Sequence, residues 1–274
     1  MKKYFDKKNN RLVVISQLAS SQYWDNLWSL KNLSEAIRKE GENKLVIYHT
    51  KKFIAPGKYK KILEGGCGKG QLVYSLNNLG YDVYGVDFAK KTINKIKEIF
   101  PELKVSYGDI THLNFPDNFF DGYWSRGVIE HFYNGYDMAT KEMTRIIKPG
   151  GYLFLTFPVF SPLRKMMALL RQYPDFNEKN INKENFYQFI LDSNAVRKDI
   201  EKLGFEIICE KKYNGILGIC DELPIINKIF KKINSNNLFI FKVLRYLLKK
   251  MVPSSFFAHS ILLIFRKSIS KETY

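Results

Sequence analysis

A glycine-rich stretch at residues 63–70, LEGGCGKG, is the part of the sequence whose residue types point most directly to chemistry. Glycines at alternate positions, Gly66, Gly68 and Gly70, let the backbone turn sharply and approach a ligand closely. Glu64 stands just ahead of them, where a carboxylate would repel a pyrophosphate but attract a cationic group such as an α-ammonium. The spacing also fits the G-x-G-x-x-G pattern of dinucleotide sites poorly. The stretch therefore predicts a site for a ligand with a cationic end and no phosphates.

A second acidic residue, Asp87, follows the glycines by about twenty positions. It stands at the end of the next predicted strand, where a carboxylate can accept hydrogen bonds from two ribose hydroxyls. Together with Glu64, Asp87 predicts a pocket for a nucleoside that carries a cationic amino-acid tail.

Alternating short apolar runs and helical patterns begin at Lys58 and are typical of βαβ units. In such sheets, ligands bind at the carboxyl ends of the strands, which is where the glycines and Asp87 fall. Helices are expected after the first two strands, over 138–147 and over 193–203. The predicted strands cover 61–63, 81–86, 104–107, 120–124, 152–157, 205–209 and 260–265.

The composition restricts the class of protein. With 274 residues and 45% hydrophobic content, the chain can bury a substantial core, which excludes a disordered chain, a collagen-like repeat and a disulfide scaffold. Three widely separated cysteines are typical of a reducing compartment, so a cytoplasmic location is expected. No signal peptide is expected, because the apolar patch at 12–15 is short and Asp6 interrupts the basic region. The uncharged stretch at 251–265 is shorter than the roughly 20 apolar residues of a membrane span.

The net charge of +17 has several readings. A basic chain can bind nucleic acid, an anionic membrane surface or an acidic substrate. Lysines scattered among Asn and Ile are also typical of chains encoded by AT-rich genes. The charge by itself therefore assigns no partner.

Five motifs in order resemble those of the class I S-adenosylmethionine-dependent methyltransferases, over about residues 58–157 and more weakly from 184 to the last strand. The resemblance rests on EGGCGKG at 64–70, Asp87, GDI at 108–110, FD at 120–121 with SRGVIEH at 125–131, and KPGGYL at 148–153. It implies an α/β, Rossmann-like sheet of seven strands with helices on both faces and the last strand antiparallel. Gly65 departs from the family, which more often has an apolar residue there, and is expected to loosen packing.

The resemblance also implies S-adenosyl-L-methionine as the cofactor and assigns residues to it. Asp87 would bind the ribose, Asp109 would hold the adenine amino group, and Ile110 would lend its backbone amide. Tyr23, in an aromatic run at 23–28, would contact the sulfonium through its ring, although these aromatics could equally only pack the first helix on the sheet. The whole cofactor-binding set is Glu64, Gly66, Cys67, Gly68, Gly70, Asp87, Phe88, Asp109, Ile110, Ser125 and Tyr23.

His131 is the candidate general base, because it follows the fourth strand and an imidazole titrates near neutral pH. Glu130 beside it would orient a neighbouring group. The alternative is that this pair caps a helix and packs against the cofactor loop. In relatives that methylate quinone precursors, acidic and His residues of this region have been linked to a metal ion, but no metal ligand is assigned here.

Three domains are expected: a helical lead-in or cap at 1–56, a methyltransferase domain at 57–212 and 258–274, and a basic helical insertion at 213–257. The insertion interleaves apolar residues with lysines and arginine (Lys228, Lys231, Lys232, Lys242, Arg245, Lys249 and Lys250), which predicts a lid over the substrate that also touches anionic membrane at its periphery.

The predicted function is O-methylation of a small or lipid-linked acceptor, such as a sugar of a surface glycan or a quinone precursor. Residues 125–128 lack the Asn/Asp-Pro-Pro-Tyr/Phe motif of base-modifying enzymes, which disfavours nucleic acid as the substrate. One alternative is a tRNA or protein methyltransferase that uses the basic surface. Another is a catalytically inactive subunit that only binds cofactor. Nothing in the sequence specifies an oligomeric state.

Overall fold

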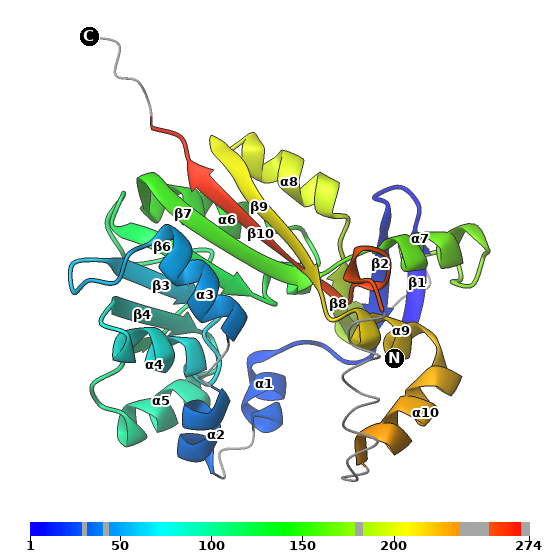
Figure 1. Ribbon diagram of the computed structural model, residues 1–274, viewed down its shortest axis with the longest axis horizontal. Helices are drawn as coiled ribbons and strands as arrows, with labels where there is room; N and C mark the ends of the chain where they lie inside the picture. The colour runs from blue at the N-terminus through cyan, green and yellow to red at the C-terminus, as the bar shows by residue number, and fades with distance from the viewer. Residues whose placement is uncertain (29–31, 41–43, 179–182, 236–251, 270–274) are drawn as a thin grey trace.

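A seven-stranded sheet forms the centre of the computed structural model, which describes residues 1–28, 32–40, 44–178, 183–235 and 252–269. The strand order is β5–β4–β3–β6–β7–β10–β9, and β10 runs antiparallel to both β7 and β9 (Figure 1). The predicted fold class, including the reversed last strand, is therefore confirmed. The strands are β3 (Lys61–Gly65), β4 (Asp82–Asp87), β5 (Lys104–Tyr107), β6 (Phe120–Arg126), β7 (Ile147–Pro158), β9 (Phe205–Tyr213) and β10 (Ser260–Lys267).

Helices cover both faces of this sheet because its strands are apolar on both sides. Along β10, Leu262 and Ile264 belong to the core under one set of helices, while Leu263 and Phe265 belong to the core under the other. Successive strand residues point to opposite faces, so a continuous apolar run serves two layers at once. The first layer contains α4 (Gln71–Asn78) and α5 (Lys90–Ile99), and the second contains α6 (Asp137–Ile146) and α8 (Ser193–Glu201).

The N-terminal segment differs from the helical lead-in predicted for residues 1–56. Its first part is a β-hairpin of β1 (Lys2–Asp6) and β2 (Arg11–Ile15), and β2 pairs with β8 (Phe186–Ile190) to complete a three-stranded sheet. The apolar patch at 12–14 is fully buried there. Helices follow only afterwards, as α1 (Ser21–Leu27), α2 (Leu33–Glu40) and α3 (Lys44–Phe53). In Figure 1, α1 lies between α5 and the small sheet, which brings the N-terminal segment to the edge of the large one.

The predicted insertion at 213–257 starts as two helices, α9 (Gly215–Glu222) and α10 (Pro224–Ser235), and ends in α12 (Ser254–Phe257). Residues 236–251, with four of its predicted basic residues, lie outside the described part of the chain. Helix α9 packs against α10 and α12, and α12 packs against α7 (Pro162–Leu169). None of the helices that the structure describes is both long and apolar enough to cross a membrane.

A charge cluster centred on the buried residues Arg164 and Glu222 connects this region to the N-terminal hairpin. The Arg164 guanidinium on α7 has no exposed surface and donates to the carboxylates of Glu222 at 2.6 Å and Asp221 at 2.7 Å on α9. Lys3 on β1 donates to the same two carboxylates, each at 2.8 Å. The Tyr173 hydroxyl donates to the second oxygen of Glu222 at 2.7 Å. The cluster thus connects β1, α7 and α9 by charged hydrogen bonds, with Arg164 and Glu222 buried and Asp221 at the surface.

Gly65 does not loosen the packing, contrary to the expectation from its departure from the family. A side chain at Gly65 would overlap the hydroxyl and the ring of Tyr123, which is fully buried on the neighbouring strand β6. The volume missing at Gly65 is therefore supplied by Tyr123.

Candidate active site

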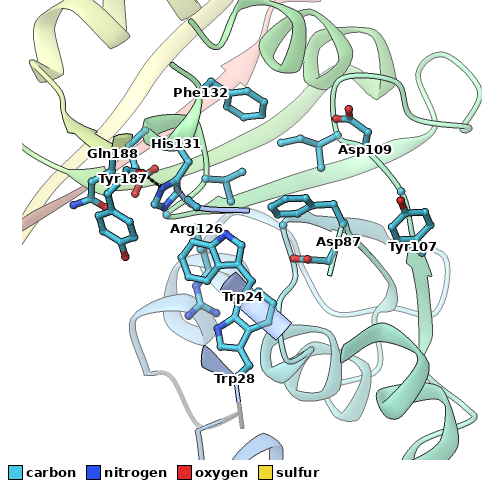
Figure 2. Close-up of a pocket in the computed structure, with 18 residues that line it drawn as sticks. Trp24, Trp28, Asp87, Tyr107, Asp109, Arg126, His131, Phe132, Tyr187 and Gln188 are labelled. Carbon is cyan, nitrogen blue, oxygen red and sulfur yellow. Dashed lines mark hydrogen bonds between the residues drawn. The ribbon is translucent and has the colours of Figure 1, made fainter. Parts of the chain in front are cut away.

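A cavity of about 890 Å³ lies at the carboxyl edge of the large sheet. Its walls come from the glycine turn, the ends of β4, β5 and β6, the helix α1 and the strand β8. Figure 2 shows Asp87, Tyr107 and Asp109 on one side of the cavity and His131, Tyr187 and Gln188 on the other. The lining residues are Ala19, Trp24, Trp28, Gly66, Asp87, Phe88, Tyr107, Gly108, Asp109, Ile110, Arg126, Gly127, Val128, Glu130, His131, Phe132, Tyr187 and Gln188.

Asp87 holds the glycine turn in place as well as lining the cavity. Its carboxylate accepts hydrogen bonds from the backbone N–H of Gly68 at 2.8 Å and of Ala89 at 2.9 Å. Burial raises the pKa of Asp87, while these two backbone donors act in the opposite direction. Each carboxylate oxygen has two lone pairs, so both oxygens can still accept a further hydrogen bond from a ligand.

The glycines keep the turn close to the cavity. Gly68 has a φ of +51°, and a side chain there would press against the Trp28 ring. Gly66 has a φ of +73° and lines the cavity itself. Both positions combine a left-handed backbone with a close neighbour, which only glycine accommodates without strain.

The far end of the cavity is formed by Phe88, Tyr107, Asp109 and Ile110. Phe88 is 41% exposed although it is a large apolar residue, and its ring is available to a flat ligand. Asp109 accepts a hydrogen bond from the Thr111 N–H at 2.8 Å, which fixes one of its oxygens. This end offers an apolar face beside a carboxylate, as a nucleobase with an amino group requires.

Helix α1 and its C-cap residue, Trp28, contribute the aromatic wall of the cavity. Trp24 and Trp28 line the cavity and stack on each other with centroids 5.2 Å apart. Asp25, between them, accepts hydrogen bonds from the Thr92 N–H at 2.9 Å and the Thr92 hydroxyl at 2.8 Å. Thr92 lies in the first turn of α5, so Asp25 caps that helix from outside and fixes the rotation of α1.

Tyr23, the predicted sulfonium contact, does not line this cavity. It packs against Tyr187 and Trp24 and borders a separate shallow pocket on the other side of α1. Trp24 and Trp28 are four residues apart on one helical face, and that spacing was the sequence signal that could have selected them over Tyr23.

His131 lies on the opposite side of the cavity in a short 3₁₀ helix, η1 (Ile129–His131). Its Nδ1 is 2.7 Å from the Tyr187 carbonyl oxygen (Figure 2). A carbonyl oxygen only accepts hydrogen bonds, so Nδ1 carries the hydrogen and Nε2 has the free lone pair in the neutral ring. Burial lowers the pKa of His131, which favours that neutral form.

A β-bulge presents this carbonyl to the histidine. In the register of β2 with β8, Val14 pairs with Gln188 and Ile15 with Phe186, so Tyr187 is the extra residue. Bulges leave such a residue out of the ladder and re-aim its groups, and they are common next to active sites. The small sheet is thus what orients His131.

Glu130 lines the cavity beside His131 and is 2% exposed. Its Oε2 has no hydrogen-bond partner among the described residues. Burial raises the pKa of Glu130 to about 8, so the group is mostly protonated at neutral pH in the absence of a ligand. A protonated carboxyl of this kind can donate a hydrogen bond to a ligand oxygen.

Several predicted cofactor residues lie behind the cavity wall. Glu64 is 3% exposed, and burial raises its pKa to about 8 even though Arg126 is 3.6 Å away. Cys67 packs against Gly85, Gly70 precedes α4 and faces Ile96, and Ser125 is fully buried. These residues do not face the cavity; they shape the turn and the end of β6. Gly68 also shapes the turn, through the hydrogen bond from its N–H to Asp87.

Of the predicted set, Gly66, Asp87, Phe88, Asp109, Ile110, Glu130 and His131 line the cavity together. The structure adds residues that the sequence reasoning did not select, notably Arg126, Phe132, Tyr187 and Gln188. Arg126 lies within the predicted 125–131 motif and Phe132 directly follows it, so both could have been included on that ground. Tyr187 and Gln188 belong to β8, and no local pattern connects that strand with His131.

The described part of the predicted lid, residues 213–257, does not contribute to the wall of the main cavity. No described residue of α9, α10 or α12 lines the main cavity, and the aromatic wall belongs to α1 and its C-cap residue. Within the described ranges, no group of three or more His, Cys, Asp or Glu side chains is placed to hold a metal ion.

Comparisons with known proteins agree with this geometry. Residues 63–155 match the family described as Methyltransferase domain. A probable S-adenosylmethionine-dependent methyltransferase of Mycolicibacterium smegmatis is 28% identical over 108 residues, which are 38% of this chain and 42% of the relative. A demethylmenaquinone methyltransferase of Renibacterium salmoninarum is 28% identical over 149 residues, which are 53% of this chain and 62% of the relative. The matched regions thus span less than two thirds of either curated relative.

A solved structure shares the fold over a longer range. The [4+2]-cyclase SpnF superposes with a TM-score of 0.55 at 17% identity, covering 94% of this chain and 99% of that one. The sheet order, the reversed last strand and the glycine turn define a class I methyltransferase domain. Residues 63–155 thus form a methyltransferase domain of the class I S-adenosylmethionine-dependent type, a family whose methyl donor is S-adenosyl-L-methionine.

The cavity fits this donor. Its volume lies within the range of about 300–1,000 Å³ usual for small-molecule sites. Asp87 would accept hydrogen bonds from the ribose, Phe88 and Asp109 would face the base, and the rings of Trp24 and Trp28 would attract the cationic sulfonium.

Replacing Asp87 with alanine is expected to weaken binding of S-adenosylhomocysteine by about 1.5–3 kcal/mol, because hydrogen bonds to a charged acceptor are lost. Isothermal titration calorimetry measures the change. Asp82→Ala is the matched control. Asp82 begins strand β4, at the end of the strand opposite to Asp87, and forms an ion pair with Lys104. An unchanged affinity in a folded Asp87→Ala variant would remove Asp87 from the ribose site.

Proposed function

We propose that this protein transfers a methyl group from S-adenosyl-L-methionine to a hydroxyl of a small or lipid-linked acceptor, with His131 as the general base. The observation that carries the proposal is the orientation of His131. Its Nδ1 donates to the Tyr187 carbonyl, which leaves the Nε2 lone pair free on a ring that lines the same cavity as Asp87 and Gly66. A donor site and a base of fixed tautomer thus share one cavity.

Each wall of the cavity has a distinct task in this reaction. S-adenosyl-L-methionine supplies the activated methyl carbon. Asp87 and the glycine turn hold its nucleoside, and Trp24 with Trp28 exclude water from the transfer. His131 accepts the hydroxyl proton of the acceptor at Nε2. Glu130 donates a hydrogen bond to an oxygen of the acceptor and so orients the acceptor.

The lining favours a flat, largely apolar acceptor. Trp24, Phe132, Tyr187 and Val128 surround the His131 side of the cavity. The relative from Renibacterium salmoninarum is named for demethylmenaquinone, which is such a molecule. These features support a quinone precursor more than a free sugar, while a sugar on a lipid carrier would present a similar apolar part.

The test is an acceptor panel with methyl-labelled donor. The protein is incubated with demethylmenaquinol, a 3,4-dihydroxyphenyl compound or a nucleotide sugar, and the products are identified by mass spectrometry. We expect label on an oxygen of an aromatic acceptor. Label on a ring carbon of demethylmenaquinol, transfer only to transfer RNA or to protein, or binding of donor with no transfer to any acceptor class, would each contradict the proposed transfer to a hydroxyl.

The last of those outcomes corresponds to a subunit that only binds cofactor. The similarity in fold to the [4+2]-cyclase SpnF shows that this architecture occurs in a protein named for a different reaction. The hydrogen bond from His131 Nδ1 to Tyr187 favours methyl transfer over a subunit that only binds cofactor, because such a subunit has no need of a free imidazole lone pair.

Contact with an anionic membrane is proposed for α10. Ile225, Ile226 and Ile229 are exposed along this helix, with Ile225 at 75%, and Lys228, Lys231 and Lys232 lie next to them. An apolar strip bordered by lysines binds at the interface of anionic lipid.

In vesicle sedimentation, we expect the protein to bind phosphatidylglycerol-containing vesicles more strongly than phosphatidylcholine vesicles, with weaker binding as salt increases. Replacing Ile225 and Ile229 with serine is expected to reduce the bound fraction. The same substitution at Leu169 and Leu170, which are exposed near the end of α7, is the control. Equal, negligible binding to both kinds of vesicle would leave α10 without a membrane role.

A further inference from the structure

A second cavity of about 430 Å³ adjoins the main one. The two cavities share Arg126 and Gly127 in their walls. The rest of the second cavity is formed by the start of α3, by Thr156 on β7, and by Tyr213 and Asn214 at the end of β9. Arg126 thus stands at the junction, at the carboxyl end of β6.

The Arg126 guanidinium is not saturated by the protein. Its contact within the described chain is with Glu64 Oε1 at 3.6 Å, which is beyond hydrogen-bond distance. Arg164 and Arg145 differ from Arg126 in this respect. Each of them donates several hydrogen bonds of 2.6–2.9 Å to carboxylates and carbonyls. The five donors of Arg126 therefore have room for a planar anion.

The surroundings of Arg126 leave its positive charge uncompensated. Burial raises the pKa of Glu64 to about 8, so the carboxyl beside Arg126 is mostly neutral at pH 7. The helix α9 begins at Gly215, directly after the lining residue Asn214, and helix N-termini carry positive partial charge. The Tyr213 hydroxyl, held by Thr156 and Ser260, adds a polar group to the same wall.

We propose that Arg126 and the second cavity form a subsite for a carboxylate, adjacent to the methyl-transfer cavity. A carboxylate matches the fork of guanidinium donors, and bidentate pairing of this kind is strong and specific. Two ligands of the proposed reaction can supply it: the amino-acid end of the methyl donor, or a carboxylate on the acceptor. The inference rests on the proposed function, because it assumes that the main cavity holds donor and acceptor.

Calorimetry with two nucleosides separates these sources. S-adenosylhomocysteine carries the amino-acid end, whereas 5′-methylthioadenosine has the same nucleoside and sulfur without it. If Arg126 holds the carboxylate of the donor, Arg126→Gln weakens binding of S-adenosylhomocysteine about 10- to 100-fold and leaves 5′-methylthioadenosine within about two-fold. Arg126→Lys restores part of the affinity, because the charge returns without the fork.

A second titration tests the acceptor as the source, with benzoate as the probe. If Arg126 holds an acceptor carboxylate, benzoate binds the protein saturated with S-adenosylhomocysteine, Arg126→Gln abolishes that binding, and affinity for S-adenosylhomocysteine stays constant. Arg197→Gln, an exposed arginine on α8, is the control for loss of charge, and thermal melts report whether each variant is folded.

The inference is overturned if Arg126→Gln, folded, changes neither binding reaction. It is also overturned if the variant weakens both nucleosides equally, because the effect would then come from a distorted cavity. Failure of the native protein to bind either nucleoside would instead overturn the proposed function, and this inference with it.

Discussion

Replacing His131 with alanine is expected to lower the turnover of methyl transfer by about 10²–10⁴-fold while binding of S-adenosylhomocysteine stays nearly constant, because a positioned base acts on the acceptor. The rate of the native protein is expected to rise with pH as His131 loses its proton. Burial lowers the pKa of His131, so the midpoint of this rise falls below 6.5. Above it the neutral imidazole predominates and the rate levels off. Steady-state kinetics from pH 5 to 8 measure both effects.

His112→Ala is the matched control, since His112 lies outside the cavity wall and contacts Thr111. It is expected to keep the native rate and the native pH profile. In His131→Ala, the residual rate is expected to lose its acid limb. A His131→Ala variant that retains most of its turnover, or keeps the same limb, would reduce His131 to a packing residue and leave proximity alone to drive the transfer.

Replacing Arg164 with methionine is expected to lower the free energy of unfolding by about 3–5 kcal/mol, because the buried carboxylate of Glu222 then loses its guanidinium partner. Arg164 is fully buried and pairs with Glu222 and Asp221, of which Glu222 is itself 8% exposed. Lys3 and Tyr173 remain as partners but cannot replace the guanidinium donors. Denaturant unfolding monitored by circular dichroism measures the loss.

Arg197→Met serves as the comparison, because Arg197 forms an exposed ion pair with Glu201 on α8. Such pairs contribute about 1 kcal/mol or less. If both substitutions cost the same, the buried cluster does not hold the hairpin, α7 and α9 together. If Arg164→Met is as stable as the native protein, the remaining donors of Lys3 and Tyr173 suffice for the carboxylates.

The large sheet could be predicted because its strands carry their own signals. Apolar runs such as 261–265 are buried on both faces of the sheet. Asp87, Gly66 and Asp109 meet because the carboxyl ends of parallel strands share one edge. The side of the cavity that contains Asp87, Gly66 and Asp109 could therefore be predicted from local patterns and strand order.

The other half depends on pairings between distant segments, which local patterns do not encode. The pairing of β2 with β8 forms the small sheet, and its bulge at Tyr187 fixes His131. The rotation of α1, which selects Trp24 over Tyr23, comes from Asp25 binding to Thr92 on another helix. The free guanidinium of Arg126 became visible only once its neighbours were placed.

The exchange of volume between Gly65 and Tyr123 has a consequence for how this sequence can change over time. A larger residue at Gly65 collides with Tyr123, and a smaller residue at Tyr123 leaves a void beside a bare backbone. Either substitution alone lowers stability, whereas the two together restore a filled core. The pair therefore shows sign epistasis. A lineage that has tyrosine at position 123 keeps glycine at position 65. A lineage that acquires an apolar residue at position 65 must lose the tyrosine before or together with that change.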